Sequence, residues 1–190
     1  MAKKHEFKPD KPYSGFFQKL LLTKKQRRSV LKWSLYAVVL LVLSVLQDVM
    51  LSRVRLFGAT TELVPCAIFL ICLLEGAENG SIFALIASLL YLFSGTAAGV
   101  YSLVFLTGLA ILTTLLRQSF MQSGFPAAML CTALAMILYE ISEFLIGVFL
   151  EMTTFSQAGS FLVTALLTMV AAPLIYLVLR AISGGDAWKE

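Results

Sequence analysis

The 190-residue chain is 59% hydrophobic and only 14% charged, with a mean hydropathy of +0.87. Soluble domains carry about a quarter charged residues, so this composition excludes an ordinary soluble domain and indicates an integral membrane protein. The net charge is +4, and ten of the fifteen Lys and Arg residues lie between Lys3 and Lys32. That asymmetry predicts which end of the protein faces the cytoplasm.

Residues 1–28 form a basic tail ahead of the first apolar segment. Phe16, Phe17, Leu20 and Leu21 recur at helical spacing among basic residues, so this stretch could lie on the inner leaflet as an interfacial helix. Each basic residue near an anionic lipid surface contributes about 1 kcal/mol. The alternative is that these charges only fix the topology. A nucleic-acid role would depend on this basic run alone, and the membrane topology explains it better.

Six apolar segments follow the tail, at residues 30–51, 62–75, 79–94, 98–116, 126–150 and 160–180. A helix needs about 20 apolar residues to cross a hydrocarbon core of about 30 Å. The sequence therefore predicts an all-α polytopic membrane protein, with six transmembrane helices in residues 29–182 and a short cytoplasmic tail at 183–190. The second and third segments are short, so five transmembrane helices plus a re-entrant hairpin over 62–94 is the alternative.

The distribution of basic residues favours six spans with both termini in the cytoplasm. Lys and Arg in short loops stay on the cytoplasmic side. Six spans place 13 basic residues inside and only Arg53 and Arg55 outside, whereas five spans place ten inside and five outside. Six spans also put the turn with Glu75 and Glu78 on the cytoplasmic side, where both carboxylates can be solvated.

Small residues recur at every fourth position from the turn between the second and third apolar segments into the third segment. They are Gly76, Gly80, Ala84 and Ser88. Because there is little hydrophobic drive between helices in lipid, close van der Waals contact along small-residue faces is a main source of association. We name these four residues the small-residue seam. It predicts a contact with a transmembrane helix, either within this subunit or from a partner.

Gly95 and Gly99 repeat this spacing in the sequence LFSGTAAGVYS, where Ser, Gly and Thr indicate a chain reversal. The six-span topology makes this an outer turn. A glycine-rich phosphate cradle is the alternative, but no Lys follows and the stretch faces outward, so a nucleotide site is not expected.

Two carboxylates in the fifth span are the strongest chemical signal. Glu140 and Glu143 are three residues apart on one helix face, well inside an apolar run. Intramembrane carboxylates are functional candidates by default. They could form a proton or cation pathway, hold a basic residue of a partner, or bind nothing and be protonated in a buried interface.

Gln47 and Asp48, near the end of the first span, complete a predicted intramembrane polar cluster with Glu140 and Glu143. The six-span topology places all four in the outer half of the membrane. Arg53 and Arg55 fall on the same side. An internal cluster in which one of these arginines neutralises Glu143 or Asp48 is favoured over ion transport.

Catalytic and metal-binding signals are nearly absent. The only histidine, His5, is in the basic tail, and Asp48 is the only Asp within a span, whereas an intramembrane aspartyl protease needs a pair. The three cysteines, at Cys66, Cys72 and Cys131, all lie in apolar segments, and their odd number suggests neither a disulfide framework nor a zinc site. We expect no enzymatic activity, no metal and no cofactor.

The order of several features resembles the rod shape-determining protein MreD family. The shared features are Gln47 in the first span, Pro65 opening an apolar run, Glu75-Gly76 at its end, Gly80, then Ser94-Gly95 and Gly99 before another span. The resemblance covers about residues 30 to 120.

This resemblance implies a non-enzymatic scaffold of the bacterial cell-elongation machinery in the cytoplasmic membrane. Members of the family sit beside the bitopic protein MreC. They connect MreB filaments, indirectly, to the peptidoglycan polymerase RodA and its transpeptidase partner.

A rival interpretation is the substrate-binding membrane subunit of an energy-coupling-factor transporter. Those subunits are also near this size, span the membrane six times, have a basic N-terminus and are rich in small residues. They bind a vitamin or metal from outside, which would give Glu140, Glu143 and the turn from Gly95 to Gly99 a role in a pocket.

Overall fold

The computed structural model describes residues 24–49, 59–95, 97, 99–120 and 124–184. Its helices are α2 (Lys24–Val49), α3 (Leu63–Glu75), α4 (Ala77–Phe93), α5 (Val100–Phe120), α6 (Phe125–Phe149), the 3₁₀ turn η2 (Phe155–Gln157) and α7 (Ala158–Ser183). The prediction of an all-helical chain is confirmed for this part of it, and each apolar segment forms one α-helix. Helix α2 begins at Lys24, inside the segment predicted as tail, and the interfacial helix predicted around Phe16 lies outside the described residues.

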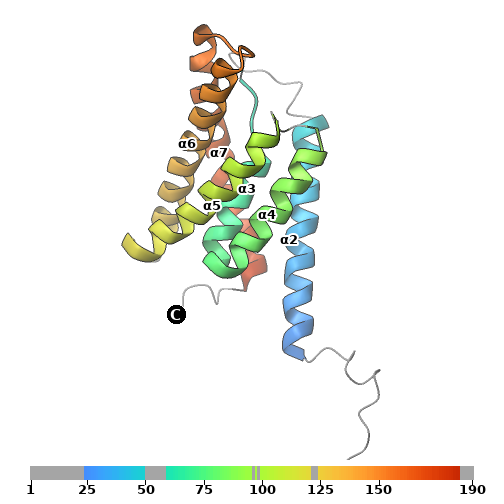
Figure 1. Ribbon diagram of the computed structural model, residues 1–190. Helices are drawn as coiled ribbons and strands as arrows, with labels where there is room; N and C mark the ends of the chain where they lie inside the picture. Colours follow the sequence, from blue (N-terminus) through green and yellow to red (C-terminus); the bar gives the residue numbers. More distant parts are fainter. Residues whose placement is uncertain (1–23, 50–58, 96, 98, 121–123, 185–190) are drawn as a thin grey trace, which may run out of the picture.

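The helices α2, α6 and α7 are long and apolar enough to cross a membrane, α7 together with the preceding η2. The three between α2 and α6 are shorter apolar helices: Leu63–Glu75, Ala77–Phe93 and Val100–Leu116. Consecutive α-helices run in opposite directions, and the start of α2 lies toward the same end of the bundle as the end of α7 (Figure 1).

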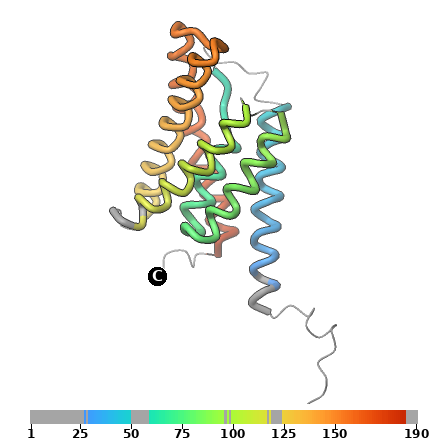
Figure 2. The backbone as a smooth tube through the Cα atoms, in the orientation of Figure 1, coloured from blue at the N-terminus to red at the C-terminus, as the bar shows by residue number. Residues whose placement is uncertain are grey.

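Helix α3 is the centre of the bundle. All residues from Leu63 to Leu74 are buried, and the other five α-helices all contact α3. Figure 2 shows its backbone running through the middle of the bundle. An apolar sequence on every face is what such a position requires. With 13 residues, α3 is about 20 Å long, shorter than the 26 residues of α2 and of α7.

The hairpin of α3 and α4 turns at Gly76, whose φ of +85° favours glycine. Four residues later, a Cβ at Gly80 would lie 2.9 Å from the Cα of Cys72. The Cys72 thiol donates to the Gly80 carbonyl at 3.1 Å. Within the small-residue seam, Gly80 thus lets α4 approach the α3 backbone.

The rest of the seam also packs inside this chain. Ala84 and Ser88 are buried, and the Ser88 hydroxyl lies 2.7 Å from the Thr107 hydroxyl on α5. Gly76 belongs to the turn rather than to the face of α4. The described seam residues therefore hold α3, α4 and α5 together.

Charges at the turn between α3 and α4 are only partly solvated. Glu75 has a side chain that is 6% exposed, and it pairs with Lys32 of α2. Tyr36 donates a hydrogen bond to the same carboxylate. The prediction that Glu75 is solvated is therefore wrong, because α2 supplies it with two partners; Glu78 is exposed, as expected.

Helix α6 ends in a Schellman motif. The amide of Met152 donates to the Gly147 carbonyl at 2.8 Å, and the amide of Glu151 donates to the Val148 carbonyl at 3.1 Å. This pattern places the C′ residue in the left-handed region, where glycine is usual. Here the residue is Glu151, with φ of +58°.

Candidate functional site at the start of the central helix

The first turn of α3 lies inside the bundle and takes its hydrogen-bond partners from other helices. Gln47 of α2 accepts the amide of Val64 through Oε1 at 3.1 Å. Thr168 of α7 accepts the amide of Glu62 through its hydroxyl at 3.0 Å. Pro65 has no amide hydrogen to satisfy, which suits a first turn. Three helices are therefore joined by polar contacts at this one point.

Glu62 stands at the N-cap of α3 without making a side-chain cap hydrogen bond. Its Oε2 atom is shielded from solvent and has no hydrogen-bond partner. The N-terminal end of a helix carries a partial positive charge, which favours a carboxylate there. The position is electrostatically reasonable, although one oxygen is left unsatisfied.

Glu143 of α6 is the best-satisfied acid of this region. Ser102 of α5 donates to its Oε1 at 2.7 Å, and Tyr139, one turn earlier on α6, donates to the same atom at 2.5 Å. The Glu143 side chain is buried. These two donors fix its carboxyl group between α5 and α6.

Glu140 is more deeply buried and less well satisfied. It is 2% exposed, and its Oε1 atom has no hydrogen-bond partner. It lies within electrostatic range of both Glu62 and Glu143. Burying a carboxyl oxygen without a partner is costly, and of these three glutamates Glu62 and Glu140 each have one such oxygen. We name the three glutamates the acidic cluster.

Tyr91 of α4 connects the acidic cluster to α2. It is buried, within electrostatic range of all three glutamates, and hydrogen-bonded to Gln47. A phenol in this position extends the polar region from α6 across the start of α3 to α2.

The predicted polar cluster is partly reassembled in the structure. Glu140 and Glu143 lie together, and Gln47 reaches the same region through Val64 and Tyr91. Asp48 occupies the next position on α2 and is half-buried. Arg53 and Arg55, expected to neutralise Glu143 or Asp48, lie outside the described residues; the partners that the structure gives Glu143 are Ser102 and Tyr139.

Five residues of this region were not predicted from the sequence: Glu62, Tyr91, Ser102, Tyr139 and Thr168. The signal for Glu62 is the sequence ELVP, because an acid before a proline-containing first turn marks a helix start. The tyrosines carry no comparable signal, since aromatic residues are common in apolar spans.

Comparisons of the chain with models of known protein families, with curated proteins and with solved structures find no match.

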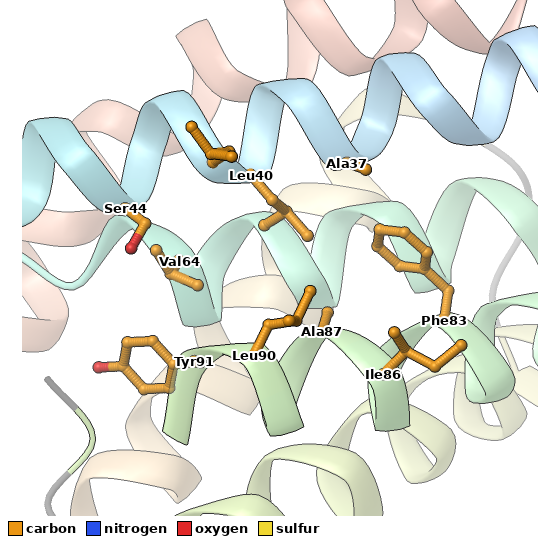
Figure 3. Close-up of a pocket in the computed structure, with 10 residues that line it drawn as sticks. Ala37, Leu40, Ser44, Val64, Phe83, Ile86, Ala87, Leu90 and Tyr91 are labelled. Atoms are coloured by element: carbon orange, nitrogen blue, oxygen red, sulfur yellow. The ribbon is translucent and has the colours of Figure 1, made fainter. Parts of the chain in front are cut away.

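An apolar groove runs along the side of the bundle between α2 and α4, with a volume of about 310 Å³. Its walls are formed by Ala37, Leu40, Leu41 and Ser44 of α2, Val64 of α3, and Phe83, Ile86, Ala87, Leu90 and Tyr91 of α4. Ser44 and Tyr91 lie at the same end of it (Figure 3). None of the three glutamates lines this groove, but Tyr91, at that end, is within electrostatic range of all of them.

Another groove, of about 380 Å³, lies between α5 and α6 and is lined by aliphatic residues with Thr113 and Cys131. None of the acidic cluster lines it. At the predicted outer turn, Gly95 has a φ of +79°, and the nearest atoms to a Cβ at Gly99 would be those of the Tyr101 ring, at the start of α5. The two glycines therefore shape a chain reversal.

The unpartnered oxygens of Glu62 and Glu140 can accept hydrogen bonds from a ligand or a partner. Within the described part of the chain, no group of three His, Cys, Asp or Glu residues is arranged to hold a metal ion. The described ion pair, Lys32 with Glu75, lies at the opposite end of α3. A hydrogen-bond donor with a positive charge would complement the unpartnered oxygens of Glu62 and Glu140.

Proposed function

We propose that this protein is a non-enzymatic membrane scaffold of the bacterial cell-elongation machinery, as its resemblance to the MreD family implies. The observation that carries the proposal is the α2–α4 groove. It opens on the side of the bundle that an apolar environment would surround, where another membrane protein can bind laterally. In the most apolar stretch of α2 only 11% of the residues are buried, compared with 39% in the corresponding stretches of α6 and α7. Most residues of this stretch of α2 are therefore open to contact with lipid or with another protein.

In this proposal six helices cross the bacterial cytoplasmic membrane and both termini are cytoplasmic. The excess of basic residues near the N-terminus supports this orientation. Helix α2 starts and α7 ends at the same end of the bundle (Figure 1), which is consistent with this orientation. The acidic cluster then lies toward the outer side, and the basic tail faces anionic lipid.

The proposed partners follow from the resemblance. A bitopic MreC-like protein binds directly, a RodA-type polymerase with its transpeptidase joins the complex, and MreB filaments are connected indirectly. A scaffold of this kind works through contact, so its measurable activity is assembly.

The proposal is tested by purifying the tagged full-length chain from its own cells and probing for the MreC-like protein. Depletion of the chain in a rod-shaped host should round the cells, and re-expression should restore the rods. A wild-type chain that captured no elongation protein, and whose depletion left cell shape unchanged, would refute the proposal.

The acidic cluster supports a second candidate, the substrate-binding subunit of an energy-coupling-factor transporter. Unpartnered buried oxygens on Glu62 and Glu140 are what a small-molecule site would use. Co-purification with ABC-type ATPases and retention of a labelled vitamin by the purified chain would favour this candidate over the scaffold.

A further inference from the structure

We propose that the α2–α4 groove and the acidic cluster form one docking site for a transmembrane helix that carries a Lys or Arg in its outer third. This inference rests on the proposed scaffold function, since it specifies how a membrane partner is recognised. Its two parts are supported by different observations: an open apolar surface and buried carboxyl oxygens without a hydrogen-bond partner.

The two buried carboxyl oxygens without a partner are the first argument. Glu140 is 2% exposed with Oε1 unpartnered, and Glu62 has Oε2 unpartnered and shielded. Both lie within electrostatic range of Glu143. Charged groups within a membrane usually pair with one another. A basic side chain would supply the donors that these oxygens lack.

The continuity of the groove with the cluster is the second argument. Val64 forms part of the groove wall, and its amide is held by Gln47 two residues after Glu62. Tyr91 closes the same end of the groove, bonds Gln47 and lies within electrostatic range of all three glutamates. A side chain that follows the groove toward Tyr91 therefore approaches the acidic cluster.

The shape of the groove indicates what fills it. Its α2 wall extends from Ala37 to Ser44, about 10 Å along the helix axis. A volume of about 310 Å³ holds a ridge of side chains but not a whole helix, whose diameter is about 10 Å. Lys and Arg carry a long apolar stem below the charged head. One ridge of a partner helix can thus fill the groove while its basic head reaches the glutamates.

The test uses the purified full-length protein in lipid vesicles and two synthetic Leu-Ala transmembrane peptides of about 20 residues. The peptides are identical except that one carries a single Lys in its outer third and the other carries Gln there. Binding is measured by energy transfer from a donor on the protein to an acceptor on the peptide. We expect the Lys peptide to bind about tenfold more tightly, which is the lower end of the coupling measured for close charge pairs across an interface.

Two pairs of matched variants locate the site. Glu140→Gln should abolish the advantage of the Lys peptide, while Glu78→Gln, the same change at an exposed residue, should keep it. Ile86→Trp fills the groove and should weaken both peptides, while Leu166→Trp on the exposed surface of α7 should weaken neither. Circular dichroism confirms that each variant retains its helical content.

Equal affinity for the two peptides, or a Lys advantage that survives Glu140→Gln in a folded variant, would overturn the inference. Binding of dodecylammonium, with the same dependence on Glu140 but no binding of either peptide, would also overturn it and identify a cationic amphiphile as the ligand. If the peptides behave as expected while the wild-type chain captures no elongation protein from cells, the docking site stands and the proposed function fails. If the MreC-like protein is captured and the peptides do not discriminate, only the docking site fails.

Discussion

The ammonium group of Lys32 lies 2.6 Å from Oε2 of Glu75 and joins the peripheral helix α2 to the end of the central helix α3. Tyr36, one turn further along α2, donates to Oε1 of the same carboxylate at 2.6 Å. The Glu75 side chain is only 6% exposed, while that of Lys32 is 30% exposed. The two contacts hold α2 against the bundle at the end opposite to the acidic cluster.

Breaking this ion pair on one side should destabilise the protein more than removing both charges. Glu75→Gln leaves Lys32 without its counter-ion, and Lys32→Met leaves a buried carboxylate, so each should lower the unfolding free energy by about 1 to 3 kcal/mol. The double variant should lose less than either single variant, because a buried pair replaced as a unit is often nearly neutral. Thermal unfolding in detergent measures the cycle. The control combines Lys32→Met with Glu78→Gln, for which the two losses of stability should simply add. If the losses for Lys32→Met and Glu75→Gln also add, the contact between Lys32 and Glu75 is contradicted.

Adding one methyl group at Gly80 should loosen the α3–α4 hairpin. The new Cβ would lie 2.9 Å from the Cα of Cys72 and 3.1 Å from its carbonyl oxygen, and backbone atoms of a buried helix cannot easily move away. Overpacking of this kind costs about 1 to 3 kcal/mol. Gly108→Ala is the control, since its Cβ would meet nothing within 4 Å. Unfolding temperatures in detergent should fall for Gly80→Ala alone, and equal temperatures would argue against the close approach.

At Glu143 the acceptor oxygen should matter more than the charge. Glu143→Ala leaves the hydroxyl groups of Ser102 and Tyr139 buried without their acceptor, a loss of about 2 kcal/mol or more. Glu143→Gln keeps an oxygen in that position and should cost about 1 kcal/mol or less. Ser142→Ala is a neighbouring control whose hydroxyl bonds only its own helix, at the Leu138 carbonyl. Equal losses for the Ala and Gln variants would show that the two hydroxyl groups find other acceptors.

Replacing Glu151 with glycine should stabilise the end of α6. Glu151 holds a φ of +58° in the Schellman motif, and the left-handed region costs a residue with a side chain about 1 kcal/mol relative to glycine. Glu151→Gly should therefore raise the unfolding free energy, whereas Glu151→Ala should not. Equal melting temperatures for the Gly and Ala variants would contradict a backbone penalty at this position. If Glu151→Gly instead melts at the wild-type temperature and Glu151→Ala melts lower, the Glu151 side chain compensates for its backbone.

Much of the fold follows from the apolar segments, because in a membrane only the length and hydropathy of a segment are needed to place a helix. The repeat of small residues likewise predicted where a second helix approaches, and Gly80 meets α3 there. Predicting Glu75 as solvated failed because Lys32 and Tyr36 come from a helix distant in sequence. For the same reason the site was incomplete: Glu62 joins Glu140 only because α3 starts deep in the bundle, and no local pattern gives that depth.

The side of the membrane on which α3 turns into α4 decides between six spans and a re-entrant hairpin. Six spans place Glu78, exposed beside that turn, in the cytoplasm, and Met152, 72% exposed after α6, outside. Cysteines introduced as Glu78→Cys and Met152→Cys should therefore differ in intact spheroplasts, where a membrane-impermeant maleimide should label only the second. As a control, both cysteines should be labelled once the membrane has been permeabilised. This control distinguishes a cysteine that faces the cytoplasm from one that the reagent cannot reach at all. Labelling of Glu78→Cys from outside would contradict six spans, because the turn would then face the same side as Met152.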